Sequence, residues 1–154
     1  MKVSLINLNL VLQDAVGMCI VNQARFFLRR GDDVHIYVCH LPAGAPDDIA
    51  ALTSAVSLAD LIGGRFPHFR RSDLFIYHYP GRHALMESIK GIERGAVIFY
   101  YHNVTPPELW GTRTDRNQLT RGAEGITLVH SADLAIADSP FNADELVELS
   151  LIHI

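Results

Sequence analysis

Three polar side chains follow directly after the most apolar run of the chain. Residues 96–101 are uninterrupted apolar or aromatic residues, and His102, Asn103 and Thr105 come next. Such a run is typical of a strand that is buried on both faces of a parallel sheet. Ligands of open α/β sheets bind beyond the carboxyl ends of the strands. We therefore take His102 as a candidate catalytic residue, because imidazole can donate or accept a hydrogen bond, and Asn103 and Thr105 as candidate substrate-binding residues.

Each of these residues also has a structural alternative. His102 could hydrogen-bond the loop backbone and fix the turn at Pro106-Pro107, and Asn103 and Thr105 could cap that turn. The two prolines predict an extended loop without helix, because proline fixes φ and restricts the residue before it. The residues alone leave both interpretations open.

His78 and Tyr79 end another predicted strand, residues 72–79. Because the carboxyl ends of parallel strands lie at one edge of a sheet, neighbouring strands would bring His78 close to His102. We include His78 and Tyr79 among the candidate substrate-binding residues.

The sequence shows no recognisable metal-binding pattern. Its eight histidines have no HxH or HExxH spacing, and Cys19 and Cys39 form no CxxC pair. We therefore expect no metal ion. The two cysteines fall in predicted core elements and are interpreted as small buried hydrophobic residues in a reducing cytoplasm.

The loop before the first predicted helix is a second candidate site. Asp14, Ala15, Val16 and Gly17 begin that helix, whose free N–H groups and positive dipole end can hold an anion or a hydroxyl group. All four are candidate substrate-binding residues, and the alternative for Asp14 is a simple N-cap. Asp138 and Ser139, at the end of the last predicted strand, could also contact substrate, and the alternative for Ser139 is a cap of the last helix. The GxGxxG and Walker fingerprints do not occur.

These residues are positioned by an alternation of predicted strands and helices. Strands are expected at residues 2–8, 33–39, 72–79, 96–101 and 133–138, and helices at 15–30, 47–61, 84–92, 117–132 and from 140 onward. This alternation predicts an α/β fold: a Rossmann-like, doubly wound, mainly parallel sheet with helices on both faces.

Length and composition describe a single globular domain. The chain has 154 residues, 49% hydrophobic residues and a net charge of −4, with 13 Lys+Arg against 17 Asp+Glu. This balance predicts no nucleic-acid partner and no polybasic membrane patch. No run is long enough to span a membrane, and the polar interruptions in the first 12 residues favour a strand over a signal peptide.

Residues 1–148 resemble the amino-terminal domain of a family 4 glycosyltransferase with the GT-B fold. The resemblance rests on Asp-Ala-Val-Gly at 14–17, His-Asn-x-Thr-Pro-Pro at 102–107 and Ala-Asp-x-Ala-x-Ala-Asp-Ser at 132–139, in this order. It implies a retaining hexosyltransferase that moves a sugar from a nucleotide-sugar donor to a glycan, lipid or small acceptor. By similarity, residues 14–17 lie beside the donor phosphates and the acceptor, and His102 lines the cleft near the transferred sugar.

The same resemblance implies two Rossmann-like domains, of which the sequence contains the acceptor-side one and lacks the donor-binding carboxyl-terminal one. We expect this fragment alone to be inactive and to need no cofactor or metal. The longer protein is expected in the cytoplasm, in peripheral association with the inner face of a membrane, in polysaccharide biosynthesis. Residues 149–154 resemble the translation of a sequencing adapter, so we expect the native domain, incomplete at its carboxyl end, to stop near Glu148.

A self-contained, non-catalytic binding module of the flavodoxin or receiver type is the alternative. A receiver needs paired carboxylates after the first strand and an acceptor aspartate after the third, where this chain has Asn7, Asn9 and His78. A flavodoxin needs a hydroxyl-rich loop where this chain has residues 9–13, Asn-Leu-Val-Leu-Gln. A sugar-nucleotide epimerase or dehydrogenase lacks support because the glycine fingerprint is missing.

Overall fold

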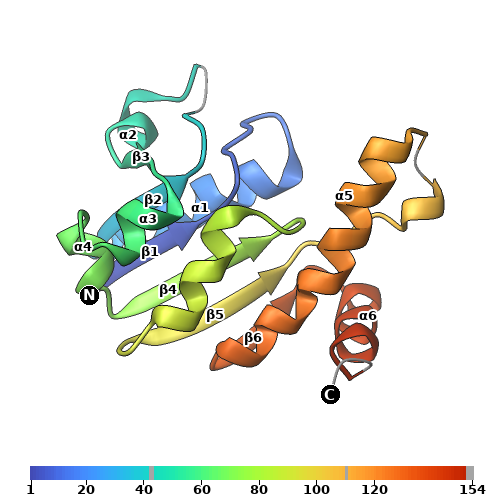
Figure 1. Cartoon of the computed structure of the whole chain (residues 1–154). Coiled ribbons are helices and arrows are strands. Elements are labelled where there is room, and N and C mark those ends of the chain that lie inside the picture. The colour runs from blue at the N-terminus through green and yellow to red at the C-terminus, as the bar shows by residue number, and fades with distance from the viewer. Residues whose placement is uncertain (42–43, 110, 152–154) are drawn as a thin grey trace.

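A computed structural model describes residues 1–41, 44–109 and 111–151. Its centre is one parallel sheet of six strands in the order β3-β2-β1-β4-β5-β6 (Figure 1). This confirms the predicted α/β, Rossmann-like class. The strands are β1 (Lys2–Ile6), β2 (Asp33–Val38), β3 (Thr53–Ala55), β4 (Leu74–Tyr79), β5 (Ala96–Tyr101) and β6 (Leu134–Ala137).

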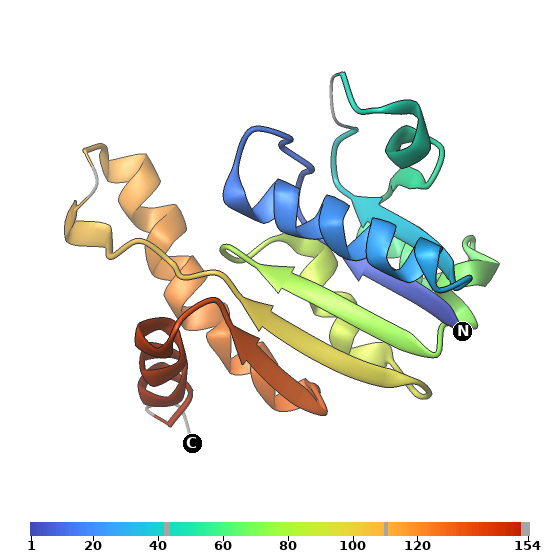
Figure 2. The same cartoon turned by 180° about the vertical axis from the view of Figure 1, so that it is seen from behind.

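Helices cover both faces of the sheet. They are α1 (Ala15–Arg29), α2 (Asp47–Ala50), α3 (Leu58–Ile62), α4 (Pro67–Arg70), α5 (Arg113–Glu124), α6 (Pro140–Leu151) and the 3-10 segments η1 (Ala84–Gly91), η2 (Pro107–Leu109) and η3 (Gly125–Ser131). Figure 2 shows α1 lying across one face, and Figure 1 shows η1 and the α5–η3 segment crossing the other.

Side chains of the central strands alternate between two hydrophobic cores. On β4, Tyr77 and Tyr79 pack in the core beneath η1 and η3, while Ile76 packs in the core beneath α1. On β5, Tyr101 belongs to the first core and Tyr100 packs against the second. Residues of even number near the ends of β4 and β5 therefore face α1.

The first helix begins and ends as the sequence predicts. The Asp14 side chain accepts a hydrogen bond from the Gly17 N–H, which makes it the N-cap. At the other end, Gly31 has a φ of 81°, a left-handed conformation that glycine adopts without steric cost. Between them, Ile20 and Phe27 are among the buried residues that face the sheet.

The predicted helix at residues 47–61 is wrong. In its place the chain forms α2, the edge strand β3 and α3. The Thr53 hydroxyl donates to the Ile49 carbonyl, and the Val56 N–H donates to Val38 of β2, so the backbone leaves the helix and pairs with the sheet. Ser57 then starts α3 with a capping box.

Other boundaries differ by element type or by a few residues. The predicted helix at 84–92 is the 3-10 segment η1, and the one at 117–132 begins earlier, at Arg113, and tightens into η3. The expectation of a helix-free proline loop is also wrong, because Pro107 opens the 3-10 turn η2. Proline is tolerated in a first helical turn, where its missing N–H has no intrahelical partner.

The chain's last residues are described only in part. The helix α6 continues to Leu151, so the first three residues of the expected non-native tail are helical, and residues 152–154 lie outside the described part. Within the described ranges, no helix is long and apolar enough to cross a membrane.

Candidate functional site

Two histidines meet beneath α1 at the carboxyl edge of the sheet. His78 lies near the end of β4 and His102 directly follows β5. Their ring atoms His78 Nδ1 and His102 Nε2 are 2.8 Å apart, which is within hydrogen-bonding distance. The prediction that neighbouring strands bring these residues together is confirmed.

Each ring is also held by its outer nitrogen. His102 Nδ1 lies 2.7 Å from Asp138 Oδ2, and His78 Nε2 lies 3.1 Å from Gln23 Oε1. A polar chain therefore runs from α1 through the ends of β4 and β5 to the residue after β6. Gln23 was not predicted, and Asp138 was expected to contact ligand but not His102, because these contacts depend on how α1 and β6 dock on the sheet.

The polar chain is mostly shielded from solvent. The His78 side chain is buried and that of His102 is 2% exposed, whereas Asp138 is 39% exposed. Burial, with a smaller contribution from the neighbouring His102, holds the pKa of His78 well below its usual value. Among these hydrogen-bonded side chains, Asp138 is therefore the one that can contact a ligand directly.

Tyr100 forms one wall of the cluster. Its ring stacks on His102 with a centroid distance of 4.5 Å and on His78 at 5.4 Å. Burial, followed by its hydrogen bond to Asp138, raises the pKa of Tyr100, so the hydroxyl stays protonated at neutral pH. Cys19 of α1 completes the cluster, and burial raises the pKa of its thiol.

The loop before α1 folds back over the helix start. A Cβ placed on Gly17 would lie 1.7 Å from the Val11 carbonyl oxygen, so glycine is required for this close approach. Asp14 acts as the N-cap, in agreement with its structural alternative. Ala15 is exposed and Val16 half-buried, so the first turn of α1 is accessible.

The remaining sequence-predicted residues are not all brought to the histidine cluster. Tyr79 is fully buried on the opposite face of the sheet, where its hydroxyl donates to the Gly122 carbonyl at 2.5 Å. Ser139 caps α6 by accepting a hydrogen bond from the Asn142 N–H. Thr105 is exposed in the loop that follows β5. Tyr79 and Ser139 thus have structural roles.

Several buried polar atoms at the same edge have no hydrogen-bond partner among the described residues. They are Oδ1 of Asn7, Asn9 and Asn103 and both ring nitrogens of His83. Asn103 also has a φ of 72°, which is uncommon for a residue other than glycine. Asn7 and Asn9 follow β1 and His83 follows β4, which are the strands between which the order of connection reverses. Ligands of doubly wound sheets bind at this switch point.

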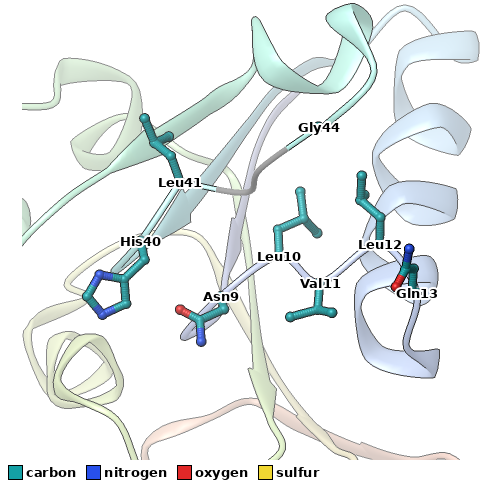
Figure 3. Close-up of a pocket in the computed structure, with 8 residues that line it drawn as sticks. All are labelled: Asn9, Leu10, Val11, Leu12, Gln13, His40, Leu41 and Gly44. Carbon is teal, nitrogen blue, oxygen red and sulfur yellow. The ribbon is translucent and has the colours of Figure 1, made fainter.

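A separate cavity of about 580 Å³ opens between the loops that follow β1 and β2 (Figure 3). The loop after β1 supplies three apolar lining residues, Leu10, Val11 and Leu12, between the polar Asn9 and Gln13. The sequence-based interpretation of residues 9–13 did not include a cavity, because it depends on the second loop. The lining residues are Asn9, Leu10, Val11, Leu12, Gln13, His40, Leu41 and Gly44.

The strand order 3-2-1-4-5-6 is that of Rossmann-type domains. Solved structures with the same fold include an α-glucosyltransferase in complex with UDP and a 13-mer DNA containing a central A:G mismatch. It is 18% identical, with a TM-score of 0.60 over 92% of this chain and 38% of that one. Another holds UDP-glucose and DNA containing an abasic site, with 18% identity and a TM-score of 0.63 over 96% and 39% of the two chains.

A third structure of an α-glucosyltransferase, with UDP and DNA containing an HMU base, is 16% identical, with a TM-score of 0.61 over 88% of this chain and 37% of that one. The chain thus spans less than two fifths of the length of these neighbours and has the architecture of one Rossmann-like half of a GT-B enzyme. No family model matches the sequence, and no curated protein matches it.

Proposed function

We propose that this chain is the acceptor-side domain of a retaining glycosyltransferase. The longer protein would move a sugar from a nucleotide-sugar donor to a glycan, lipid or small acceptor. The observation that carries the proposal is the fold shared with α-glucosyltransferases that hold UDP or UDP-glucose, over 88–96% of this chain. The histidine cluster at the carboxyl edge, where such sheets bind ligands, supports it.

A retaining transfer needs stabilisation of charge on the leaving phosphate while positive charge develops on the sugar. The N–H groups of Ala15 and Val16 lie in the first turn of α1, at the positive end of its dipole, where they are suited to bind a phosphate oxygen. Asp138, oriented by His102, is suited to accept a hydrogen bond from a sugar hydroxyl. Direct contact between His102 and the sugar would require its nearly buried ring to be uncovered.

The acceptor in this proposal is not a nucleic acid. The chain carries 17 acidic against 13 basic residues, and this balance does not favour a phosphate backbone. The cavity of Figure 3 has the mixed apolar and polar lining that suits a sugar ring or a lipid-linked sugar. We place the reaction in the cytoplasm at the membrane surface. Residues 1–154 are inactive by themselves in this proposal, because the cationic groups that bind the donor belong to a second domain.

The strand order argues against the binding-module alternative. Without β3 the remaining strands lie in the order β2-β1-β4-β5-β6. Renumbered along the chain, this is the order 2-1-3-4-5 of flavodoxins and receivers. The pairing of Thr53, Ser54 and Ala55 with β2 adds the outer strand of the Rossmann order.

The proposal is tested first by reading the source gene beyond codon 148, which should encode a second α/β domain. The full protein is then assayed for release of nucleoside diphosphate from a panel of nucleotide sugars. We expect His102→Ala and Asp138→Asn to lower kcat by on the order of tenfold or more, because the first removes the group that orients the Asp138 carboxylate and the second removes the carboxylate itself. Asp144→Asn, at an exposed position of α6, is the matched control. Absence of donor turnover in the full protein, or equal rates in Asp138→Asn and Asp144→Asn, would contradict the proposal.

A further inference from the structure

Three side chains that can ligate a metal converge from three elements. Cys19 comes from α1, His78 from β4 and His102 from the start of the loop after β5. The Cys19 Sγ atom and one ring nitrogen of each histidine all lie within 4.8 Å of one another. Thiolate sulfur and imidazole nitrogen are ligand atoms that Zn²⁺ prefers in proteins, and three protein ligands leave the fourth tetrahedral position open.

The outer hydrogen bonds fix which ring nitrogens are free. An Asp138 carboxylate oxygen at 2.7 Å makes His102 Nδ1 the protonated nitrogen, so its Nε2 carries the lone pair. Gln23 Nε2 donates to Cys19 Sγ at 3.5 Å, which leaves Gln23 Oε1 to accept from His78 Nε2 and gives His78 Nδ1 a lone pair.

Two nitrogen lone pairs thus point at each other across 2.8 Å. That arrangement is repulsive unless a positive species lies between them, either a shared proton or a cation. Histidines that bind a metal through one ring nitrogen usually donate the N–H of the other to a carboxylate or another oxygen. Asp138 is such a partner for His102, and Gln23 is such a partner for His78.

We propose that Cys19, His78 and His102 bind one Zn²⁺ ion beneath α1, with a fourth position open to water or another ligand. Zinc–nitrogen bonds of about 2.0 Å place two tetrahedral ligand nitrogens about 3.3 Å apart. The two rings, 2.8 Å apart, therefore separate by roughly half an ångström on binding, and the sulfur moves inward. Cys19 loses its thiol proton to solvent as the Zn–S bond forms.

The site departs from our expectation of no metal, which rested on spacing in the sequence. Its ligands are 59 and 24 residues apart, since they occupy positions 19, 78 and 102, so no short motif marks them. The inference does not rest on the proposed glycosyl transfer, because metal binding is measured without a substrate.

The test is titration of the untagged chain with Co²⁺, a spectroscopic substitute for zinc, followed by displacement with Zn²⁺. We expect one equivalent of Co²⁺ to give the near-ultraviolet absorption of a cobalt–thiolate bond, and Zn²⁺ to abolish it. Cys19→Ser should remove this absorption and weaken zinc binding by at least about tenfold. Asp138→Asn should weaken zinc binding by about 10- to 100-fold while keeping the thiolate absorption, because it changes only the partner of a ligand.

The matched control is Cys39→Ser, since Cys39 is the other half-buried free cysteine and packs against the core on the opposite face of the sheet. It should leave the absorption unchanged. Far-ultraviolet circular dichroism checks that each variant is folded, and the exposed Asp138 position carries the test if Cys19→Ser does not fold. No thiolate absorption in the wild-type chain, or its loss in Cys39→Ser alone, overturns the proposal. So do ring-nitrogen NMR signals of His78 and His102 that stay unchanged when zinc is added, because the rings then share only a proton.

Discussion

Gly17 shows how one absent side chain lets the loop before α1 pack on the helix. The Val11 carbonyl oxygen occupies the space that a Cβ would need. Gly17→Ala should therefore destabilise the chain by about 1–3 kcal/mol, the usual cost of overpacking a site. The measurement is urea unfolding. Gly91→Ala is the matched control, because nothing lies within 4 Å of a Cβ at that exposed position. Equal stability of both variants would show that the loop moves freely away from the helix.

Buried histidines predict how stability depends on pH. Burial lowers the pKa of His83 from 6.5 to about 4, and burial likewise lowers the pKa of His35 to about 4. Between these values the unfolded chain binds protons that the folded chain does not, so stability is full above about pH 6.5 and falls as the pH drops toward 4. From pH 7 to pH 5 we expect His83 to contribute a loss of roughly 2 kcal/mol.

His83→Leu tests this contribution, because it removes the titrating group from a site where neither ring nitrogen has a partner among the described residues. Urea unfolding at pH 7 and pH 5 should show a smaller pH-dependent loss in the variant than in the wild type. The remaining loss belongs to other buried histidines, including His78. An unchanged difference between the two pH values would mean that His83 is solvated or paired in solution.

At the scale of elements, α1 links the fold to the candidate site. Its N-cap, Asp14, is also a candidate substrate-binding residue, and two variants separate these roles. Asp14→Ala should cost about 1 kcal/mol because the Gly17 N–H loses its acceptor, while Asp14→Asn keeps the cap. Thermal unfolding gives the stability of each, and donor affinity in the full protein gives binding. A loss of affinity in Asp14→Asn at unchanged stability would show that the carboxylate contacts the ligand.

The elements that the sequence predicted are those whose local pattern and tertiary environment agree. β5 has the predicted bounds because its apolar residues from Val97 to Tyr101 are buried or half-buried and because Gly95, which has a φ of 86°, precedes the strand. β3 was missed because its three residues are half-buried or exposed at the sheet edge and take their conformation from pairing with β2. A helical pattern across residues 47–61 could not reveal that pairing.

Only part of the candidate site could be predicted from the sequence. Placing His78 beside His102 needs only the rule that adjacent parallel strands end together. Cys19 and Gln23 were missed, and the contact of Asp138 with His102 was not foreseen, because these contacts depend on the rotation of α1 about its axis and on the docking of β6. Neither is encoded in spacing along the chain.

At the scale of the whole molecule, the two edges of the sheet are unequal. One edge is β3, a short strand that lies between α2 and α3 in the chain. The other edge is β6, and three of its four residues are exposed. Leu134 is 54% exposed and Ile136 37% exposed. An exposed apolar edge strand is a template for pairing with another chain.

We therefore expect the isolated chain to self-associate through the β6 edge as its concentration rises. Leu134→Lys should shift sedimentation velocity profiles toward the monomer, because a lysine on an edge strand opposes edge-to-edge pairing. Leu109→Lys is the matched control, since Leu109 is 72% exposed on η2, away from the sheet edge. Both substitutions add the same charge, so a general effect of net charge would act equally on both. A wild-type chain that stays monomeric at high concentration, or equal profiles for the two variants, would contradict association through β6.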